Sequence, residues 1–389
     1  MRHVLVLAFL AMVLTACSES LEFADWTIPV PEGTEIIGYA DVPLDERVDH
    51  IEMVEELVIG DQGDVNALYA FGRPSDVAVD AAGRIYVLDG QTSSVQVFGA
   101  DGEFIRPLSR EGQGPGEFQR PRSIEAVGDV IVVVDPGNAR LSHFDIDGNH
   151  LGDHPVPRFS NLHTMVGTDS GEMVGSTTRF IEADEIEWAV GAYSLLGELS
   201  RTYVEVTYKQ VPTIQRGTRS TYYSRMPSAY PIVAASLRGA VYWSKSDEYQ
   251  VLAVAPDGSP RWALRVAATP GPLLSQQVDE IMGLVRNTYE DATESEVNWP
   301  DRQPAISRVL VDGHGHLYVF PYVYVPLGLG ASDPVPVDVY APGGERLFTG
   351  MATPRFWVHA EGDFIYETVI DPLSEEWIVR KSRLVEPFE

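Results

Sequence analysis

The amino-acid sequence predicts an all-β protein: a six-bladed β-propeller with one short helical insertion. Three observations lead to this fold: a unit of four short strands, the recurrence of that unit along the chain, and a spare strand ahead of the first unit. The strands are bounded by Gly, Asp and Pro, the residues that tight turns use. A repeat of about 40 to 50 residues with four strands per unit is typical of a propeller array.

The clearest unit covers residues 74–107. Val77 and Val79 alternate with other residues at the period of a strand, and a turn then leads into the apolar run 85–88. Residues 95–98 form a third strand, and the Asp101-Gly102 turn after it is a strong hairpin signal that leads into a fourth. Four antiparallel strands joined by tight turns make one propeller blade.

The same pattern recurs along the rest of the chain. Further units are predicted at 122–156, 161–206, 230–266, 306–351 and 355–384. The last unit offers only three strands, whereas residues 54–59 form a plausible strand before the first unit. We therefore expect residues 54–59 to pair with the last blade and close the ring, which would remove the exposed sheet edges.

One stretch breaks the β pattern and is predicted to be a helical insertion at about 269–305. Its apolar residues lie at helical spacing, on one face of an amphipathic helix: Leu274, Val278, Ile281, Val285 and Tyr289. Ser275 is a possible N-terminal cap. An acidic loop that contains Trp299 follows the helix.

The N-terminus predicts export. An apolar run at 4–14 follows a basic start and is too short to span a bilayer comfortably. Leu14-Thr15-Ala16-Cys17 resembles the lipobox of a bacterial lipoprotein, with Cys17 as the lipidated residue; an ordinary secretory signal is the alternative. Cys17 is the single Cys of the chain, so no internal disulfide can form. The expected organisation is a signal peptide at 1–17, a tether at 18–50 and the propeller at 51–389.

The formal net charge is −29, which disfavours binding to nucleic acid or adsorption to anionic lipid. Solubility is the simplest explanation of the acidity. We expect a monomer without a cofactor, held at a membrane of the cell envelope by its lipid anchor alone, on the periplasmic or surface face.

A family resemblance appears in the first two units. The segment Gly112-Gln113-Gly114-Pro115-Gly116-Glu117-Phe118 resembles the linker that opens an NHL repeat, and Asp135-x-x-Asn138-x-Arg140 matches the motif that follows in such repeats. The chain, lipobox included, is similar to bacterial six-bladed propeller lipoproteins of poorly defined function. It departs from the pattern where unit one has Ser94 in place of Arg140, and the later units lack the linker.

Several motifs allow a site but favour a structural role. The glycine-rich linker could cradle a phosphate, but no helix follows it. His314 and His316 are predicted to flank a turn rather than chelate a metal. Asp89 and Asp135 each end a second strand and could hold calcium in the channel, as in six-bladed lactonases, although such residues more often accept hydrogen bonds from the following loop. No Gly-x-Ser-x-Gly motif or Cys–His pair is present.

Recognition residues gather in long loops that one face of the ring should carry. They are aromatic or cationic side chains at 209–231, in the insertion and at 321–336: Arg216, Arg219, Tyr222, Tyr223, Arg225, Trp299, Tyr322 and Tyr324. Tyr, Trp and Arg dominate binding hot spots, although any one of these residues could instead pack its loop onto the ring. The sequence therefore favours a binding or scaffold module for a protein, peptide or glycan. A calcium-dependent lactonase or lyase is the alternative.

Overall fold

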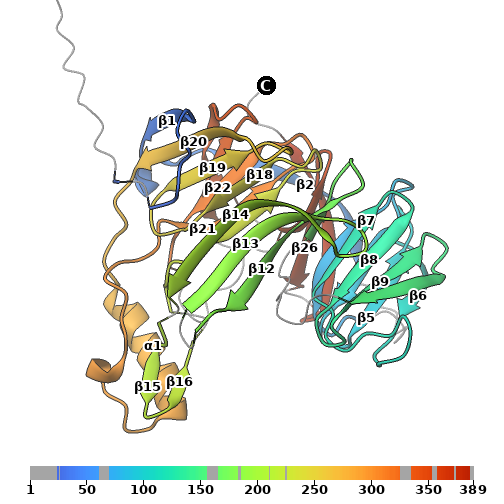
Figure 1. Cartoon of the computed structure of the whole chain (residues 1–389), viewed down its shortest axis with the longest axis horizontal. Helices are drawn as coiled ribbons and strands as arrows, with labels where there is room; N and C mark the ends of the chain where they lie inside the picture. Colours follow the sequence, from blue (N-terminus) through green and yellow to red (C-terminus); the bar gives the residue numbers. More distant parts are fainter. Residues whose placement is uncertain are drawn as a thin grey trace, which may run out of the picture.

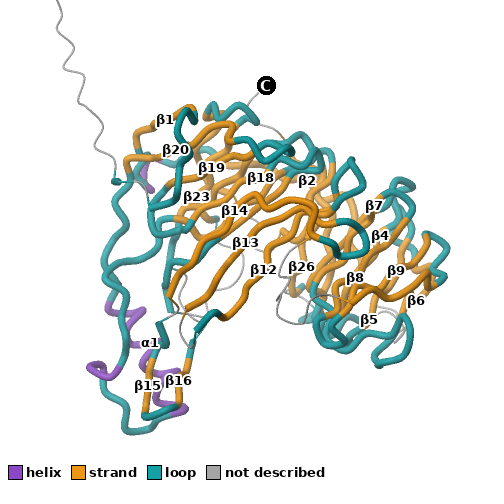
Figure 2. Tube along the Cα trace, viewed as in Figure 1, coloured by secondary structure: helices purple, strands orange, loops and turns teal. Residues whose placement is uncertain are grey.

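Six blades, each built on four antiparallel strands, succeed one another along the chain and make a six-bladed β-propeller, as the sequence predicted (Figure 1). The computed structural model describes residues 24–25, 27–60, 70–155, 165–182, 185–209, 211–223, 226–324, 334–352, 357–371 and 374–385. Strands fill the body of the molecule, and the helix α1 (Ser275–Thr288) lies outside this body (Figure 2).

The first strand of each blade is innermost, so consecutive first strands are neighbours around the central axis. Blade one contains β3 (Pro74–Val79), β4 (Ile85–Asp89), β5 (Ser94–Phe98) and β6 (Phe104–Ser109). Blade two contains β7 (Ser123–Val127), β8 (Val130–Asp135), β9 (Arg140–Asp145) and β10 (His150–Pro155). Blade three contains β11 (Met165–Gly167), β12 (Met173–Phe180), β13 (Glu185–Tyr193) and β14 (Leu199–Lys209).

The second half of the ring repeats this order. Blade four contains β17 (Ile232–Ala235), β18 (Val241–Ser244), β19 (Gln250–Val254) and β20 (Pro260–Ala267). Blade five contains β21 (Ile306–Val311), β22 (Leu317–Pro321), β23 (Val335–Tyr340) and β24 (Arg346–Ala352). Blade six contains β25 (Trp357–Glu361), β26 (Phe364–Ile370), β27 (Trp377–Val385) and, from the N-terminal part of the chain, β2 (His50–Ile59).

Two insertions between blades form an appendage that projects from the ring (Figure 1). It consists of the hairpin β15 (Ile214–Arg216) and β16 (Arg219–Thr221) and of the segment 269–305, with α1 (Ser275–Thr288) and the 3-10 turn η2 (Glu294–Glu296). The predicted helix is confirmed, but Ser275 is its first residue rather than its cap. The cap is Leu274, whose N–H donates to Oε1 of Gln277 at 2.7 Å.

Each blade buries both of its faces, which explains the continuous apolar run of β4. Tyr86 and Leu88 point toward blade two, whereas Ile85 and Val87 point toward blade six. Alternation along the strand thus sends successive side chains to opposite neighbours. The described residues form one apolar cluster at each of the six interfaces between blades. Full burial of one such aliphatic side chain contributes about 1.5–3 kcal/mol.

The ring is closed by β2, as expected. Its residues pair antiparallel with β27, from Glu52 opposite Val385 to Ile59 opposite Val379, so that β2 becomes the outermost strand of blade six. The predicted residues 54–59 all lie within this strand. The chain therefore joins its N-terminal and C-terminal parts in one sheet.

Part of the segment that we expected to be a tether is instead folded onto the ring. Strand β1 (Glu35–Ala40) pairs in parallel with β20 as a fifth strand of blade four. Farther along, after the 3-10 turn η1 (Leu44–Glu46), Arg47 is buried and its Nη1 lies 2.9 Å from Oδ1 of Asp338. The hydroxyl of Tyr249 donates to the same carboxylate at 2.6 Å. These contacts fasten residues 35–47 to blades four and five.

We predict that a chain starting at Pro74 will not fold into a soluble monomer, because it lacks β2 and leaves β27 as an unpaired edge. A chain starting at Ala24, which keeps β1 and β2, is the matched control. Size-exclusion chromatography and circular dichroism compare the two. A monomeric, cooperatively melting protein from the shorter chain would show that β2 is not needed for closure.

Candidate functional site

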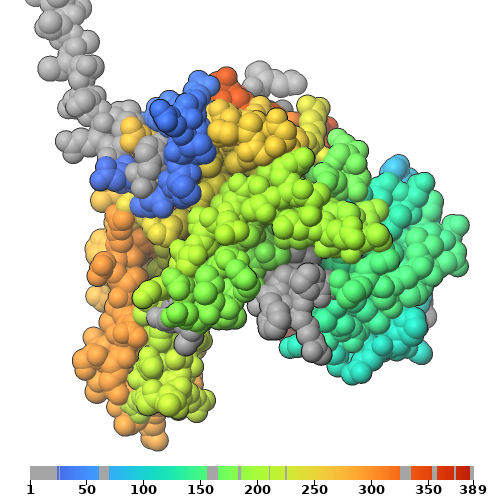
Figure 3. Space-filling view, viewed as in Figure 1, coloured from blue at the N-terminus to red at the C-terminus, as the bar shows by residue number. Residues whose placement is uncertain are grey.

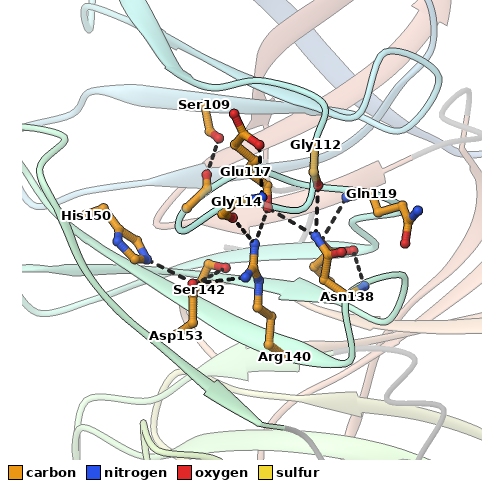
Figure 4. Close-up of polar contacts among 12 residues, drawn as sticks. Ser109, Gly112, Gly114, Glu117, Gln119, Asn138, Arg140, Ser142, His150 and Asp153 are labelled. Atoms are coloured by element: carbon orange, nitrogen blue, oxygen red, sulfur yellow. Dashed lines mark hydrogen bonds and ion pairs between the residues drawn. The ribbon is translucent and has the colours of Figure 1, made fainter.

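The NHL-like motif fixes the linker between blades one and two (Figure 4). Nη2 of Arg140 donates to the carbonyl oxygens of Gly114 and Glu117, the latter at 2.6 Å. Nδ2 of Asn138 donates to the carbonyls of Gly112 and Glu117, at 3.0 and 3.2 Å. The glycine-rich segment is therefore held by side chains of blade two, and its carbonyl oxygens face these donors. This arrangement supports the linker role that the sequence favoured.

Asp135 and Asp89 occupy equivalent positions in successive blades, where each accepts hydrogen bonds from the backbone of the linker before its blade. Both residues are fully buried. Asp135 accepts hydrogen bonds from the backbone N–H groups of Gln119 and Arg120, each at 2.9 Å. Asp89 accepts from the N–H groups of Gly72 and Arg73, at 2.6 and 3.1 Å. Each carboxylate also accepts from the loop that follows it, Asp89 from the N–H of Thr92 and Asp135 from the N–H of Gly137, which is the structural role that the sequence favoured.

His314 and His316 lie at the turn between β21 and β22, as the sequence indicated, and each faces a different carboxylate. Nε2 of His314 is 2.6 Å from Asp363, whereas Nδ1 of His316 is 2.9 Å from Asp312. Within the described part of the chain, no three His, Cys, Asp or Glu side chains form a group that could hold a metal ion.

Four of the eight predicted recognition residues make contacts within the appendage. Arg216 pairs with Asp291 at 2.7 Å and with Glu296 at 2.8 Å. The guanidinium groups of Arg216 and Arg219 lie over the ring of Tyr289, at 5.1 and 5.6 Å from its centroid. These contacts hold the hairpin of β15 and β16 against α1 and the segment that follows it.

The aromatic members of the set divide between packing and exposure. Tyr223 and Trp299 pack against the apolar cluster of the appendage, which is centred on Ile281, Met282 and Val285. Tyr222 is 43% exposed. Arg225 lies outside the described residues, so its role stays a prediction.

Tyr322 and Tyr324 help to line a cleft of about 260 Å³ between the appendage and blades four and five, which we call the side cleft. Residues from four segments of the chain meet there: 226–230, α1, 304–307 and 322–324. Figure 3 shows the appendage standing out from the ring beside these blades. Nε2 of Gln277, on α1, donates to the hydroxyl of Tyr322 at 3.2 Å. The side cleft is thus lined by residues from three regions that the sequence analysis treated separately: 209–231, the helical insertion and 321–336.

The central channel holds a second group of polar residues that the sequence analysis did not single out. An inner cavity of about 260 Å³ is lined by residues of the first strands of all six blades, among them Asp76, Glu125 and His359. A vestibule of about 400 Å³ follows toward the turns between first and second strands, and Glu125 and His359 line it too. The only signal in the sequence was a charged residue within an otherwise apolar first strand.

Burial governs the protonation of these channel residues. It raises the pKa of Asp76 to about 7, against hydrogen bonds from the N–H of Ile124 and the hydroxyl of Ser123. It also raises the pKa of Glu125 well above its ordinary value, and the charge of Asp76 adds to this effect. His359 shifts the other way, because burial lowers its pKa to about 4. Strongly shifted groups that share a cavity are typical of functional sites.

The comparisons with known proteins agree with the fold. A family model described as a 6-bladed beta-propeller matches residues 69–188. No curated protein sequence matches the chain. A protein described as exported, from Bacteroides fragilis NCTC 9343, has a solved structure with a TM-score of 0.50 and 14% identity, covering 90% of this chain and 100% of that one.

Two other solved structures place these similarities in context. A member of the duf4221 family from Bacteroides vulgatus has a TM-score of 0.50 and 13% identity, and the match covers 86% of this chain and 99% of that one. A calcium-binding protein, regucalcin, from Agrobacterium tumefaciens is 9% identical with a TM-score of 0.42, over 91% of this chain and 98% of that one. At these identities the likeness shows the fold alone, and the regucalcin match carries no argument.

We predict that Asp76→Asn stabilises the protein more as the pH rises. The pKa of Asp76 is about 7 in the folded protein, against an ordinary value of 3.8, so the folded state holds a proton between these values that the unfolded chain has released. The free energy of unfolding of the parent should therefore fall as the pH rises from about 4 to about 7, whereas Asn in place of Asp76 contributes no such fall. The difference in free energy of unfolding between Asp76→Asn and the parent should level off above pH 7.

Thermal melting of both proteins from pH 4 to 9 tests this. Asp145→Asn is the control, because hydrogen bonds from Asn149 lower the pKa of that exposed carboxylate and its effect should be flat over the same window. The lowered pKa of His359 also makes stability depend on pH, but it does so equally in the parent and in Asp76→Asn, so it cancels in the difference. A pH-independent gap between Asp76→Asn and the parent would contradict the assignment.

Proposed function

We propose that the chain is an extracytoplasmic binding module, attached to an envelope membrane through Cys17, that recognises a protein, peptide or glycan at the side cleft. The observation that carries this proposal is the convergence at one cavity of segments that are far apart in the sequence. Ligand sites are typically concave and mostly apolar, with a few fixed polar groups.

The chemistry of the side cleft supports recognition. Tyr230 is 51% exposed at its rim, and Tyr322 and Tyr324 line its wall. Aromatic rings of this kind offer a large, rigid contact area at low entropic cost. Gln277 is almost fully buried, and its Oε1 accepts from Gln303 at 3.0 Å, so the amide is held in place before a ligand arrives. Preorganised contacts of this kind favour binding.

Export is supported by the lipobox-like sequence before Cys17 and by the likeness to a protein described as exported. None of the helices that the structure describes is long and apolar enough to cross a membrane. The anchor that we propose is the lipid on Cys17, from the lipobox-like sequence alone.

The binding proposal predicts that Tyr230→Ala weakens ligand capture about tenfold or more, as loss of an aromatic hot-spot residue does. The matched control is Tyr222→Ala, which removes a Tyr of similar exposure outside the cleft lining. The full chain is screened on peptide and glycan arrays, and hits are measured by calorimetry for the parent and both variants. Equal affinities for the parent and Tyr230→Ala would place binding elsewhere.

The anchoring proposal predicts that Cys17→Ser moves the protein from the membrane fraction to the soluble fraction of the envelope. A thioether to lipid needs the sulfur of Cys17, and acyl chains are the only membrane attachment that we propose. Cell fractionation with immunoblotting measures the distribution. A Cys17→Ser protein that still sediments with membranes, in cells where it carries no lipid, would identify another anchor.

A further inference from the structure

The central channel is a candidate site independent of the side cleft. Its inner cavity and vestibule meet at Glu125 and His359, which line both. Glu125 is only 9% exposed, and its Oε2 accepts the N–H of Gly167 at 3.2 Å. Asp76, on the neighbouring strand β3, accepts the N–H of Ile124 at 2.9 Å. Both carboxylates are thus fixed by the backbone at the wall of the cavity.

The two carboxylates have hydrogen bonds but no counter-charge. Among the described residues, neither Asp76 nor Glu125 forms an ion pair with Lys, Arg or His. A buried carboxylate without a cation is costly, so such a group takes up a proton or a positively charged partner. A positively charged partner can reach both carboxylates because both side chains border a cavity.

The opposite wall of the cavity is apolar. In a ring of six blades, blades four and five face blades one and two across the axis. Blade four contributes Val233 and Ala234, and blade five contributes Val309 and Leu310. An occupant in contact with both walls therefore needs a cationic end and an apolar body.

His359 supplies the second polar feature. Its Nε2 is buried and has no hydrogen-bond partner among the described residues. A neutral imidazole nitrogen can accept a hydrogen bond from an N–H donor. An unsatisfied buried polar atom beside a cavity is the kind of group that a ligand completes.

The remaining charged groups around the inner cavity do not cancel the two carboxylates. Asp312 is buried and accepts from the hydroxyl of Tyr318 and from His316. Arg122 also lines the inner cavity and is exposed. The vestibule is lined by four acidic residues: Asp80, Glu125, Asp169 and Glu361. None of the described residues that line it is Lys or Arg. An acidic vestibule attracts cations toward the cavity.

We propose that the inner cavity binds a small organic ammonium ion, whose charged head lies between Asp76 and Glu125 and whose apolar body contacts blades four and five. Charge-assisted hydrogen bonds from the ammonium group to the carboxylates, and one to His359, hold the head. A calcium ion fits less well, because it takes 6–8 oxygen ligands. The described residues offer no group of three or more metal ligands.

Binding is coupled to proton release. The ammonium ion binds the ionised carboxylates, so protons leave Asp76 and Glu125 when the ligand enters at a pH below their raised pKa values. Affinity should rise with pH by about tenfold per pH unit for each proton released, and should change less steeply above about pH 7, where Asp76 is already ionised. The observed calorimetric enthalpy should depend on the ionisation enthalpy of the buffer over the same range.

The test uses the full chain and a series of alkylammonium ions from propyl to octyl, with 2-phenylethylammonium, against the alcohols of the same shape. Calorimetry and thermal melting follow binding between pH 5 and 8. We expect binding of at least one amine, no binding of its alcohol, and a loss of about tenfold or more in Asp76→Asn and Glu125→Gln. Glu205→Gln, which changes an exposed carboxylate on β14, is the control and should bind as the parent does.

Each alternative outcome is decisive. Equal binding of amine and alcohol, unchanged affinity in both channel variants, or an affinity independent of pH would overturn the proposal. So would stabilisation by Ca²⁺ but by no amine of the series. If Glu125→Gln does not fold, the alcohol comparison and the pH series on the parent still decide, together with Asp76→Asn.

Discussion

The need of every blade for two neighbours governs this structure. A sheet whose central strand is apolar on both faces, as β4 is, can bury them only between two other sheets. Six blades satisfy one another only if the last also meets the first. The pairing of β2 with β27 makes blade six a complete four-stranded sheet, and blade six then covers blade one through the cluster that contains Ile59 and Tyr366. Closure is thus the condition on which each interface depends.

Buried polar contacts then fix how the blades are joined. Asp89 and Asp135 each collect backbone N–H groups of the linker that enters their blade, so the connection is held without a helix or a disulfide. Arg47 performs a comparable role from outside the ring, because its ion pair with Asp338 ties the N-terminal segment to blade five. Buried pairs of this kind specify a position more than they add stability, since the removal of one partner leaves an unpaired charge.

The side cleft and the central channel differ in the chemistry of the ligand that each would bind. The side cleft is built on insertions and offers tyrosine rings with one fixed amide, which suits contact with an extended surface. The channel is built on the first strands of the ring and places two carboxylates where they oppose folding at neutral pH. Residues that cost stability and border a cavity are expected where binding or chemistry takes place.

The sequence by itself determined the number of blades, the order of strands, the helical insertion and the closing strand, because each follows from local periodicity and turn residues. It also indicated that the glycine-rich segment 112–118 is a linker and that Asp89 and Asp135 accept hydrogen bonds from the loop that follows each of them. Only the tertiary structure decided that Arg216 and Trp299 serve the appendage, since their partners Asp291 and Glu294 belong to a fold whose packing local pattern cannot show. Likewise, Asp76, Glu125 and His359 meet because ring closure brings blades one, two and six around one axis. The spacing of these three residues along the sequence does not indicate that they are close in space.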